Sequence, residues 1–200
     1  MYGTERRLMR QGRRTVAGVD EAGRGPLAGP VVAAAVVLDP GDPIAGLADS
    51  KALSRLRREG LFDEILRRAR AVAVAAAGPR EIERTNILAA SLRAMACAAG
   101  RLPLSLDHLL VDGNRPIPFD APQTPVVSGD ALCASIAAAS IVAKVLRDRL
   151  MERMDRRFPQ YGFGRHKGYP TREHLEALRA HGPCSLHRRT FRGVRAPGRG

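Results

Sequence analysis

Two adjacent carboxylates, Asp20 and Glu21, stand directly before the glycine-rich run Gly23-Arg24-Gly25. The chain around them carries a formal net charge of +13, and such an excess of positive charge is typical of proteins that bind nucleic acid. Acidic side chains at a polyanion site would repel the polyanion unless divalent cations lie between them. The pattern therefore predicts metal-dependent chemistry on a phosphodiester.

Two further aspartates occupy the ends of predicted elements. Asp112 follows the apolar run 109–111, and Asp20 is the last residue of the predicted strand 15–20. Asp130 lies in the first turn of a predicted helix, where a carboxylate also suits the helix dipole. Taken singly, each is more often a turn former or a helix cap. Their shared placement at element ends favours convergence on one edge of a sheet.

Asp39 and Glu21 test this interpretation. Asp39 also follows an apolar run, residues 31–38. If that run pairs antiparallel with residues 15–20, Asp39 lies at the end of the sheet opposite to Asp20. We therefore expect Asp39 to be a turn residue. Glu21 raises a difficulty, because successive strand residues point to opposite faces. It joins Asp20 only if the regular strand ends at Asp20, which the following glycine-rich run favours.

The ligand type indicates which metal is expected. Four converging carboxylates would carry four negative charges, which two divalent cations would neutralise. Oxygen ligands select Mg²⁺ or Mn²⁺ over zinc. A zinc site is a weaker alternative, because the spacing of its candidate ligands matches no ordinary zinc module. Those candidates are His174, His181, Cys184 and His187.

The composition suits one domain of ordinary size. Of 200 residues, 44% are hydrophobic and only 4% aromatic, so the core must be aliphatic. No run reaches membrane length and no secretory signal is apparent, so we expect a cytoplasmic protein without a membrane partner. The three cysteines are odd in number and widely spaced, which predicts reduced, mostly buried thiols at Cys97, Cys133 and Cys184.

The order of elements predicts an α/β fold with a mixed central sheet flanked by helices. Strands are expected over residues 15–20, 31–38, 71–77, 109–111 and 126–127. Helices are expected over residues 54–70, 79–99, 130–156 and 171–181, with a glycine and aromatic loop over 159–169. Ser54 and Thr171 are the expected N-caps, and Gly182 ends the last helix.

Three regions follow from this pattern. Residues 1–14 are expected to form a basic flexible tail, residues 15–195 a single catalytic domain, and residues 196–200 a flexible C-terminus.

Lysine is rare in this arginine-rich chain. Of 33 Lys and Arg residues, only Lys51, Lys144 and Lys167 are lysines. A compact ammonium suits a phosphate oxygen, so these positions are candidate phosphate contacts.

Six blocks along the chain form a recognisable series. They are residues 16–36, Asp49-Ser50-Lys51, Val111-Asp112-Gly113, Ser128-Gly129-Asp130 with 136–144, His166-Lys167-Gly168-Tyr169 and His187-Arg188-Arg189-Thr190-Phe191. Together, in order and at suitable spacing, they resemble the bacterial ribonuclease HII family over nearly the whole chain.

The resemblance implies an RNase H-like fold with a C-terminal helical extension. It implies a metal-dependent endoribonuclease that hydrolyses the RNA strand of RNA/DNA hybrids, using Mn²⁺ or Mg²⁺ and two ions during catalysis. It also implies cutting 5′ of single ribonucleotides embedded in duplex DNA, giving 3′-hydroxyl and 5′-phosphate ends. We expect a monomer, and no clear motif for docking on a replication clamp is present.

The resemblance also assigns roles to individual residues. The catalytic and metal-binding acids are Asp20, Glu21, Asp112 and Asp130. The substrate-binding residues are Gly23, Arg24, Gly25, Lys51, Lys144, Lys167 and Tyr169, with the tyrosine stacking on a sugar. Two departures remove positive charge: Ser128 and Ala52 stand where the family commonly has lysine. Pro170 is an accepted variant of a glycine position.

Two other functions fit parts of the sequence. Residues 23–28 fit the dinucleotide-binding pattern G-x-G-x-x-A, but residues 31–38 look like a strand where that motif needs a helix. A non-enzymatic, basic nucleic-acid-binding protein would explain the charge. It would have no need for carboxylates at strand ends.

Overall fold

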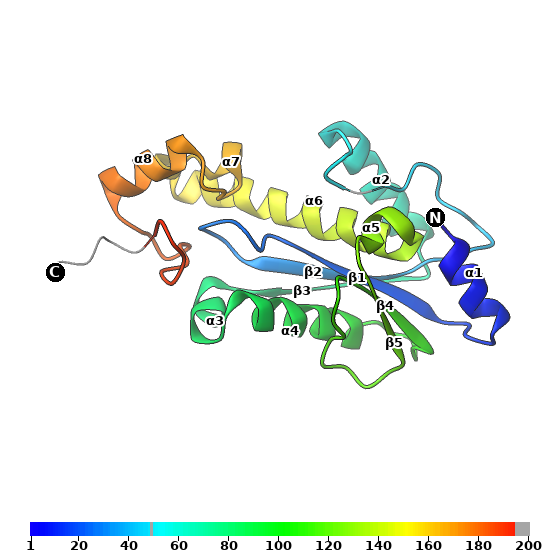
Figure 1. Ribbon diagram of the computed structural model, residues 1–200. Coiled ribbons are helices and arrows are strands. Elements are labelled where there is room, and N and C mark those ends of the chain that lie inside the picture. Colours follow the sequence, from blue (N-terminus) through cyan, green and yellow to red (C-terminus); the bar gives the residue numbers. More distant parts are fainter. Residues whose placement is uncertain (49, 195–200) are drawn as a thin grey trace.

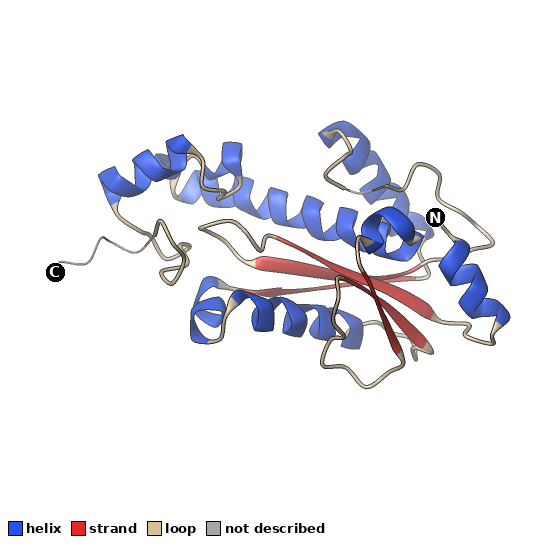
Figure 2. Cartoon of the chain, in the orientation of Figure 1, coloured by secondary structure: helices blue, strands red, loops and turns tan. Residues whose placement is uncertain are grey.

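A five-stranded mixed sheet lies between two layers of helices in the computed structural model, which describes residues 1–48 and 50–194 (Figures 1 and 2). The strand order is β3-β2-β1-β4-β5. The strands are β1 Val16–Ala22, β2 Val31–Val37, β3 Ala71–Ala77, β4 His108–Asp112 and β5 Gln123–Val126. β1, β2 and β3 pair antiparallel, whereas β4 runs parallel to β1 and β5 parallel to β4. The predicted α/β fold with a mixed sheet is therefore confirmed.

Helices cover both faces of this sheet. They are α1 Gly3–Arg10, α2 Arg55–Arg68, α3 Pro79–Arg84, α4 Ile87–Gly100, α5 Gly129–Leu132, α6 Ala134–Arg157, α7 Phe163–His166 and α8 Arg172–His181, with a 3₁₀ helix η1 at Pro159–Tyr161. The long helix α6 crosses one face with α2 beside it, and α3 and α4 cover the other (Figure 1). α7 and α8 form the predicted C-terminal helical extension beyond the sheet.

The sheet is buried on both faces because its strands are made of small aliphatic residues. Every residue of β2 is buried. Ala33 and Ala35 belong to the core under α4, whereas Ala34 and Val36 belong to the core under α6 and α2. Two cores of this kind need apolar residues at successive strand positions, which explains the continuous apolar runs in the sequence.

Gly18 allows α6 to lie directly against β1. A Cβ at this position would come within 2.2 Å of the backbone carbon of Ser135 and 2.3 Å of the Ile136 nitrogen. Only glycine permits so close an approach. The first turn of α6 is therefore fixed two residues before Asp20 along β1.

The N-terminal segment differs from the prediction. Residues Gly3–Arg10 form α1 instead of part of a flexible tail. The Glu5 side chain is buried and its Oε1 accepts hydrogen bonds from the Ser135 backbone N–H at 2.9 Å and from the Ser135 hydroxyl at 2.7 Å. A carboxylate at the N-terminus of α6 also suits the helix dipole, so contacts far apart in sequence order this segment.

Two predicted helices are interrupted. The helix expected over 79–99 divides at Thr85, and Asn86 starts α4 by accepting a hydrogen bond from the Ala89 N–H at 2.9 Å. The helix expected over 130–156 divides at Cys133, whose backbone is extended. Residues 159–169, expected as a loop, contain η1 and α7.

Several local predictions are confirmed. Ser54 and Thr171 cap α2 and α8 by accepting hydrogen bonds from the backbone N–H groups three residues ahead. Gly182 follows the last residue of α8. Asp39 is exposed and accepts a hydrogen bond from the Gly41 N–H at 2.8 Å, as expected of a turn residue.

The cysteines are only partly as expected. All three are free, but Cys133 is the one that is buried, while Cys184 is intermediate and Cys97 exposed. Within residues 1–48 and 50–194, no helix is both long and apolar enough to cross a bilayer. The domain limits at residues 15 and 195 remain predictions, and residues 195–200 lie outside the described residues. Asp49, the first residue of the second sequence block, also lies outside them.

Candidate active site

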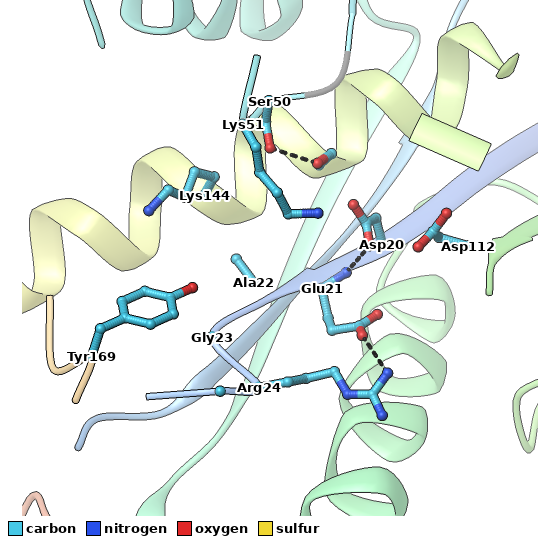
Figure 3. Close-up of a pocket in the computed structure, with 12 residues that line it drawn as sticks. Asp20, Glu21, Ala22, Gly23, Arg24, Ser50, Lys51, Asp112, Lys144 and Tyr169 are labelled. Carbon is cyan, nitrogen blue, oxygen red and sulfur yellow. Dashed lines mark hydrogen bonds and ion pairs between the residues drawn. The ribbon is translucent and has the colours of Figure 1, made fainter. Parts of the chain in front are cut away.

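A pocket of about 340 Å³ opens at the end of β1, between the tip of the sheet and α6 (Figure 3). Carboxylates, lysines, a glycine-rich loop and a tyrosine share its wall. The lining residues are Asp20, Glu21, Ala22, Gly23, Arg24, Gly25, Ser50, Lys51, Asp112, Ser140, Lys144 and Tyr169.

Parallel pairing of β1 with β4 brings two of the predicted acids together. Val19 is paired with Val111, so Asp20 and Asp112 are the next residues at the same end of neighbouring strands. Asp20 is only 5% exposed, and Asp112 accepts a hydrogen bond through Oδ1 from the Gly129 N–H at 2.8 Å. The predicted convergence of these two aspartates is confirmed.

Glu21 reaches the pocket for a different reason from the one expected. β1 does not end at Asp20 but continues to Ala22. Asp20 and Glu21 leave the strand on opposite sides, and both line the pocket, which lies around the end of β1 and the loop that follows it (Figure 3). The Glu21 N–H donates to Asp20 Oδ1 at 2.6 Å, and the Glu21 carboxylate pairs with Arg24 at 3.3 Å.

Asp130 lies beside the pocket and not in its wall. The residue is buried in α5, and its Oδ2 is 3.8 Å from the Lys51 ammonium, which does line the pocket. Its neighbour Gly129 is hydrogen-bonded to Asp112. The structure therefore places three of the four predicted acids in the pocket and the fourth next to them.

Burial and mutual repulsion act on the charge of these acids. The pKa of Asp20 is raised well above its usual value, first by burial and then by Glu21 and Asp112. Burial also raises the pKa of Glu21, against the lowering effect of Arg24. Negative charge in this pocket is therefore costly unless a cation compensates it.

The donor set fits a hard divalent cation. Its donors are carboxylate oxygens, which suit Mg²⁺ and Mn²⁺. In the described part of the chain, no three Asp, Glu, His or Cys side chains already form a closed group of metal ligands. An incomplete set of protein ligands is compatible with a Mg²⁺ site, because Mg²⁺ is bound by one or two carboxylates together with waters and substrate phosphates. Among those described residues, His174, His181, Cys184 and His187 form no group of metal ligands either, so the zinc alternative gains no support.

The three lysines separate into two kinds. Lys51 and Lys144 line the pocket, the latter also pairing with Asp148 at 2.8 Å. Lys167 does not line it: its ammonium donates to Glu152 at 2.9 Å and to the Gly164 carbonyl. The expectation that all three share the carboxylate face is correct for two of them and wrong for Lys167, which an ion pair holds elsewhere.

The glycine-rich loop and Tyr169 face one another across the pocket (Figure 3). Gly23 has a φ of +99°, and a Cβ there would collide with the Arg147 guanidinium. A Cβ on Gly25 would lie 3.7 Å from the Tyr169 ring. Tyr169 is 42% exposed, so its ring is available to a ligand instead of filling the core.

Sequence reasoning assigned no role to Ser140 or Ser50. Their hydroxyl oxygens are 2.8 Å apart, and Ser140 also hydrogen-bonds Asp20, which favours the charged carboxylate. Ser140 is the one polar residue in the apolar run 136–143, a signal that could have identified it.

The fold and the site together define a class of protein. Strand-end carboxylates on a mixed five-stranded sheet, in an open pocket of a strongly basic chain, define a metal-dependent nuclease with an RNase H-like fold. The chain belongs to the ribonuclease HII family, whose sequence profile matches residues 17–194.

Relatives and solved structures agree with this assignment. A ribonuclease HII of Shewanella amazonensis is 55% identical over 188 residues, covering 94% of this chain and 90% of the relative. One of Xanthobacter autotrophicus is 59% identical over 191 residues, covering 96% of this chain and 76% of the relative. The ribonuclease H2 of Pyrococcus horikoshii OT3 superposes with a TM-score of 0.77 at 29% identity, covering 90% of this chain and 95% of that one. Bst-RNase HIII in complex with Mn²⁺ shares the fold, with a TM-score of 0.69 at 19% identity, covering 90% of this chain and 68% of that one.

Family membership settles the general activity. The protein is a metal-dependent endoribonuclease, a hydrolase that acts on RNA/DNA hybrids and requires a divalent metal. The dinucleotide-binding alternative is excluded, because strand β2 stands where a helix N-terminus would be needed. The non-enzymatic alternative is excluded by the family.

Proposed function

We propose that this enzyme cuts the phosphodiester on the 5′ side of a ribonucleotide, including a single ribonucleotide embedded in duplex DNA. The products would carry 3′-hydroxyl and 5′-phosphate ends. The observation that carries this proposal is the placement of the strand-end acids, the Gly23–Gly25 loop and Tyr169 in one pocket. Such a pocket could read a sugar and act on the adjacent phosphate at the same time.

Asp20, Glu21, Asp112 and Asp130 would hold the divalent metal, as two Mg²⁺ or Mn²⁺ ions during catalysis. Bound there, the metal would neutralise charge on the phosphate and lower the pKa of a water nucleophile. Asp20 is held for this role by the Glu21 N–H and by Ser140, both of which favour its charged form. Asp130 would complete the set from the side of α5.

The nucleic-acid backbone would be positioned by the two lysines in the pocket wall. Lys51 is well exposed, with 78% of its side chain accessible, and can move to meet a phosphate. Lys144 would need only to exchange Asp148 for a phosphate oxygen. These contacts orient the strand electrostatically and carry no information about the sugar.

Discrimination between RNA and DNA would come from the loop and Tyr169. A 2′-hydroxyl both donates and accepts hydrogen bonds, so backbone groups can recognise it. Gly23 and Gly25 have no side chains, which lets the loop backbone come close to a sugar. The Tyr169 ring would stack on the neighbouring deoxyribose at the RNA–DNA junction.

The test compares three end-labelled duplexes: one with a single ribonucleotide, one with a continuous RNA strand, and one of DNA alone. We expect cleavage of the first two and none of the third, with a product ladder that places the cut 5′ of the ribonucleotide. In H₂¹⁸O, one ¹⁸O atom should enter the 5′-phosphate, because the oxygen of water forms the new bond to phosphorus while the 3′-oxygen leaves. Activity on long hybrids without activity on the single-ribonucleotide duplex would overturn the proposal that the enzyme cuts 5′ of a single embedded ribonucleotide.

A further inference from the structure

We propose that Arg188 is a positioning residue that sets the geometry between the Gly23–Gly25 loop and Tyr169, and that a buried histidine pair links it to that tyrosine. This inference rests on the proposed function, because it concerns how the two substrate-reading elements are held. Arg188 does not line the pocket and would act through the loop.

Arg188 binds three backbone carbonyls of one loop. The side chain is fully buried, and it donates through Nε to the Gly29 carbonyl at 2.9 Å. Its Nη1 donates to the Arg24 carbonyl at 2.8 Å and its Nη2 to the Gly23 carbonyl at 2.6 Å. A flat guanidinium satisfies three carbonyls in fixed directions, which an ammonium on a flexible stem does not.

Within residues 1–48 and 50–194, no carboxylate forms an ion pair with this buried charge. Among the ion pairs of the described residues, none within 4 Å includes Arg188. Burial and the nearby Arg147 lower the pKa of Arg188 to about 9, so it keeps its proton at neutral pH. A buried cation without an acid partner is unfavourable on its own. Its three hydrogen bonds all go to backbone carbonyls of the loop between β1 and β2, which indicates that its role is to hold that loop.

Arg147 holds the same loop from α6. It donates to the Pro30 carbonyl at 3.0 Å and to the Ala28 carbonyl at 3.2 Å. It also donates to the Lys167 carbonyl at 3.1 Å, in the segment that leads to Tyr169. The loop between β1 and β2 is therefore fixed by two guanidinium groups, one from α6 and one from the C-terminal segment.

A chain of hydrogen bonds connects Arg188 to Tyr169 through its neighbour His187. The Cys184 backbone N–H donates to His187 Nδ1 at 3.0 Å, so the proton of neutral His187 is on Nε2. That Nε2 lies 3.0 Å from Nε2 of His174, which therefore accepts. His174 Nδ1 then donates to the Tyr169 carbonyl at 2.9 Å.

This arrangement requires both histidines to be neutral. A second proton on either ring would place two N–H groups against each other. Burial lowers the pKa of His174, and it lowers that of His187 to about 4, in agreement with the neutral forms. We call His174, His187 and Arg188 the positioning triad. It joins the backbone of Tyr169 to the backbone of the glycine-rich loop.

The test uses Arg188→Lys, with Arg189→Lys as the matched control at the next, exposed position. The measured quantity is the ratio of kcat/KM on the single-ribonucleotide duplex to kcat/KM on the continuous hybrid. Partial unfolding of a variant lowers both values equally and leaves this ratio unchanged. We expect Arg188→Lys to lower the ratio about 10- to 100-fold, mainly through kcat, because a misplacement near 1 Å has effects of that size.

A second pair of variants covers the case in which Arg188→Lys does not fold. His187→Gln retains a donor near the position of Nε2, whereas His187→Asn is too short to reach His174. We expect His187→Asn to lower the selectivity ratio and His187→Gln to restore part of it. The metal concentration for half-maximal activity should stay within twofold of wild type in every folded variant, since the triad does not touch the acids.

The outcomes separate this inference from the proposed function. If the wild-type enzyme fails on the single-ribonucleotide duplex, the proposed function is wrong. If it succeeds, and Arg188→Lys and His187→Asn only lower the melting temperature while the ratio stays at the wild-type value, the positioning role is wrong.

Discussion

Replacing Gly18 by alanine should disturb the active site through a backbone contact. The new Cβ would lie 2.2 Å from the Ser135 backbone, whereas ordinary contact begins at 3.4 Å, so β1 and α6 must separate by about 1.2 Å. The change lies two residues from Asp20, and α6 carries Ser140 and Lys144. Overpacking of this kind lowers the free energy of unfolding by about 1–3 kcal/mol. A displacement near 1 Å at the site should lower kcat/KM about 100-fold.

Thermal unfolding and steady-state cleavage measure the two effects separately. For a chain of this size, the expected loss corresponds to a melting temperature lower by about 2–12 °C. The control is Gly60→Ala: this exposed glycine lies inside α2, and a Cβ there would meet nothing within 4 Å. That change should stabilise the protein by about 0.5–1 kcal/mol and leave activity unchanged. Wild-type kcat/KM and melting temperature in Gly18→Ala would refute the proposed contact between β1 and α6.

Three further predictions concern charge. Lys51→Ala and Lys144→Ala should each reduce the salt dependence of substrate binding by about one phosphate contact, whereas Lys167→Ala should leave it unchanged; equal slopes in all three would contradict this difference. Without metal, Asp20→Asn should raise the melting temperature, because burial and like charges disfavour the carboxylate, and added Mg²⁺ or Mn²⁺ should stabilise it less than wild type. The third prediction uses the Asp20→Asn variant, because the raised pKa of Asp20 would by itself make the protein more stable as pH falls. In this variant the free energy of unfolding should fall as pH drops from 6.5 towards 4. The reason is that His187 takes up a proton in the unfolded chain at a pH where the folded residue stays neutral. Denaturant unfolding at a series of pH values measures this, and a flat profile would contradict the neutral histidine pair.

The sheet and its acids could be predicted because local signals agree with the global fold. Asp20 and Asp112 each come directly after apolar residues of a strand, and a glycine lies close behind each of them. The pattern does not show that β1 continues to Ala22, so it gave the wrong reason for the placement of Glu21. Regular strand geometry argues against two adjacent residues sharing a site, and only the position of the pocket at the sheet edge removes that objection.

Long-range contacts account for most of what the sequence did not reveal. α1 is ordered by the bond from Ser135 to Glu5, 130 positions apart, which no local periodicity indicates. Arg147 and Arg188 were overlooked because arginine is common throughout the chain, and only the fold shows which arginines are buried. Lys167 was misplaced because its rarity suggested a phosphate contact, whereas Glu152 holds it.

The most direct test of the central claim is cleavage of the single-ribonucleotide duplex by wild type and by Asp20→Asn, side by side, in saturating Mg²⁺ and in saturating Mn²⁺. Asp20 is the buried acid that the structure places between Glu21, Asp112 and Ser140. We predict a metal-dependent cut 5′ of the ribonucleotide by the wild type, and no detectable product from a variant that remains folded by its thermal unfolding. Near-normal turnover by Asp20→Asn with either metal would contradict the account.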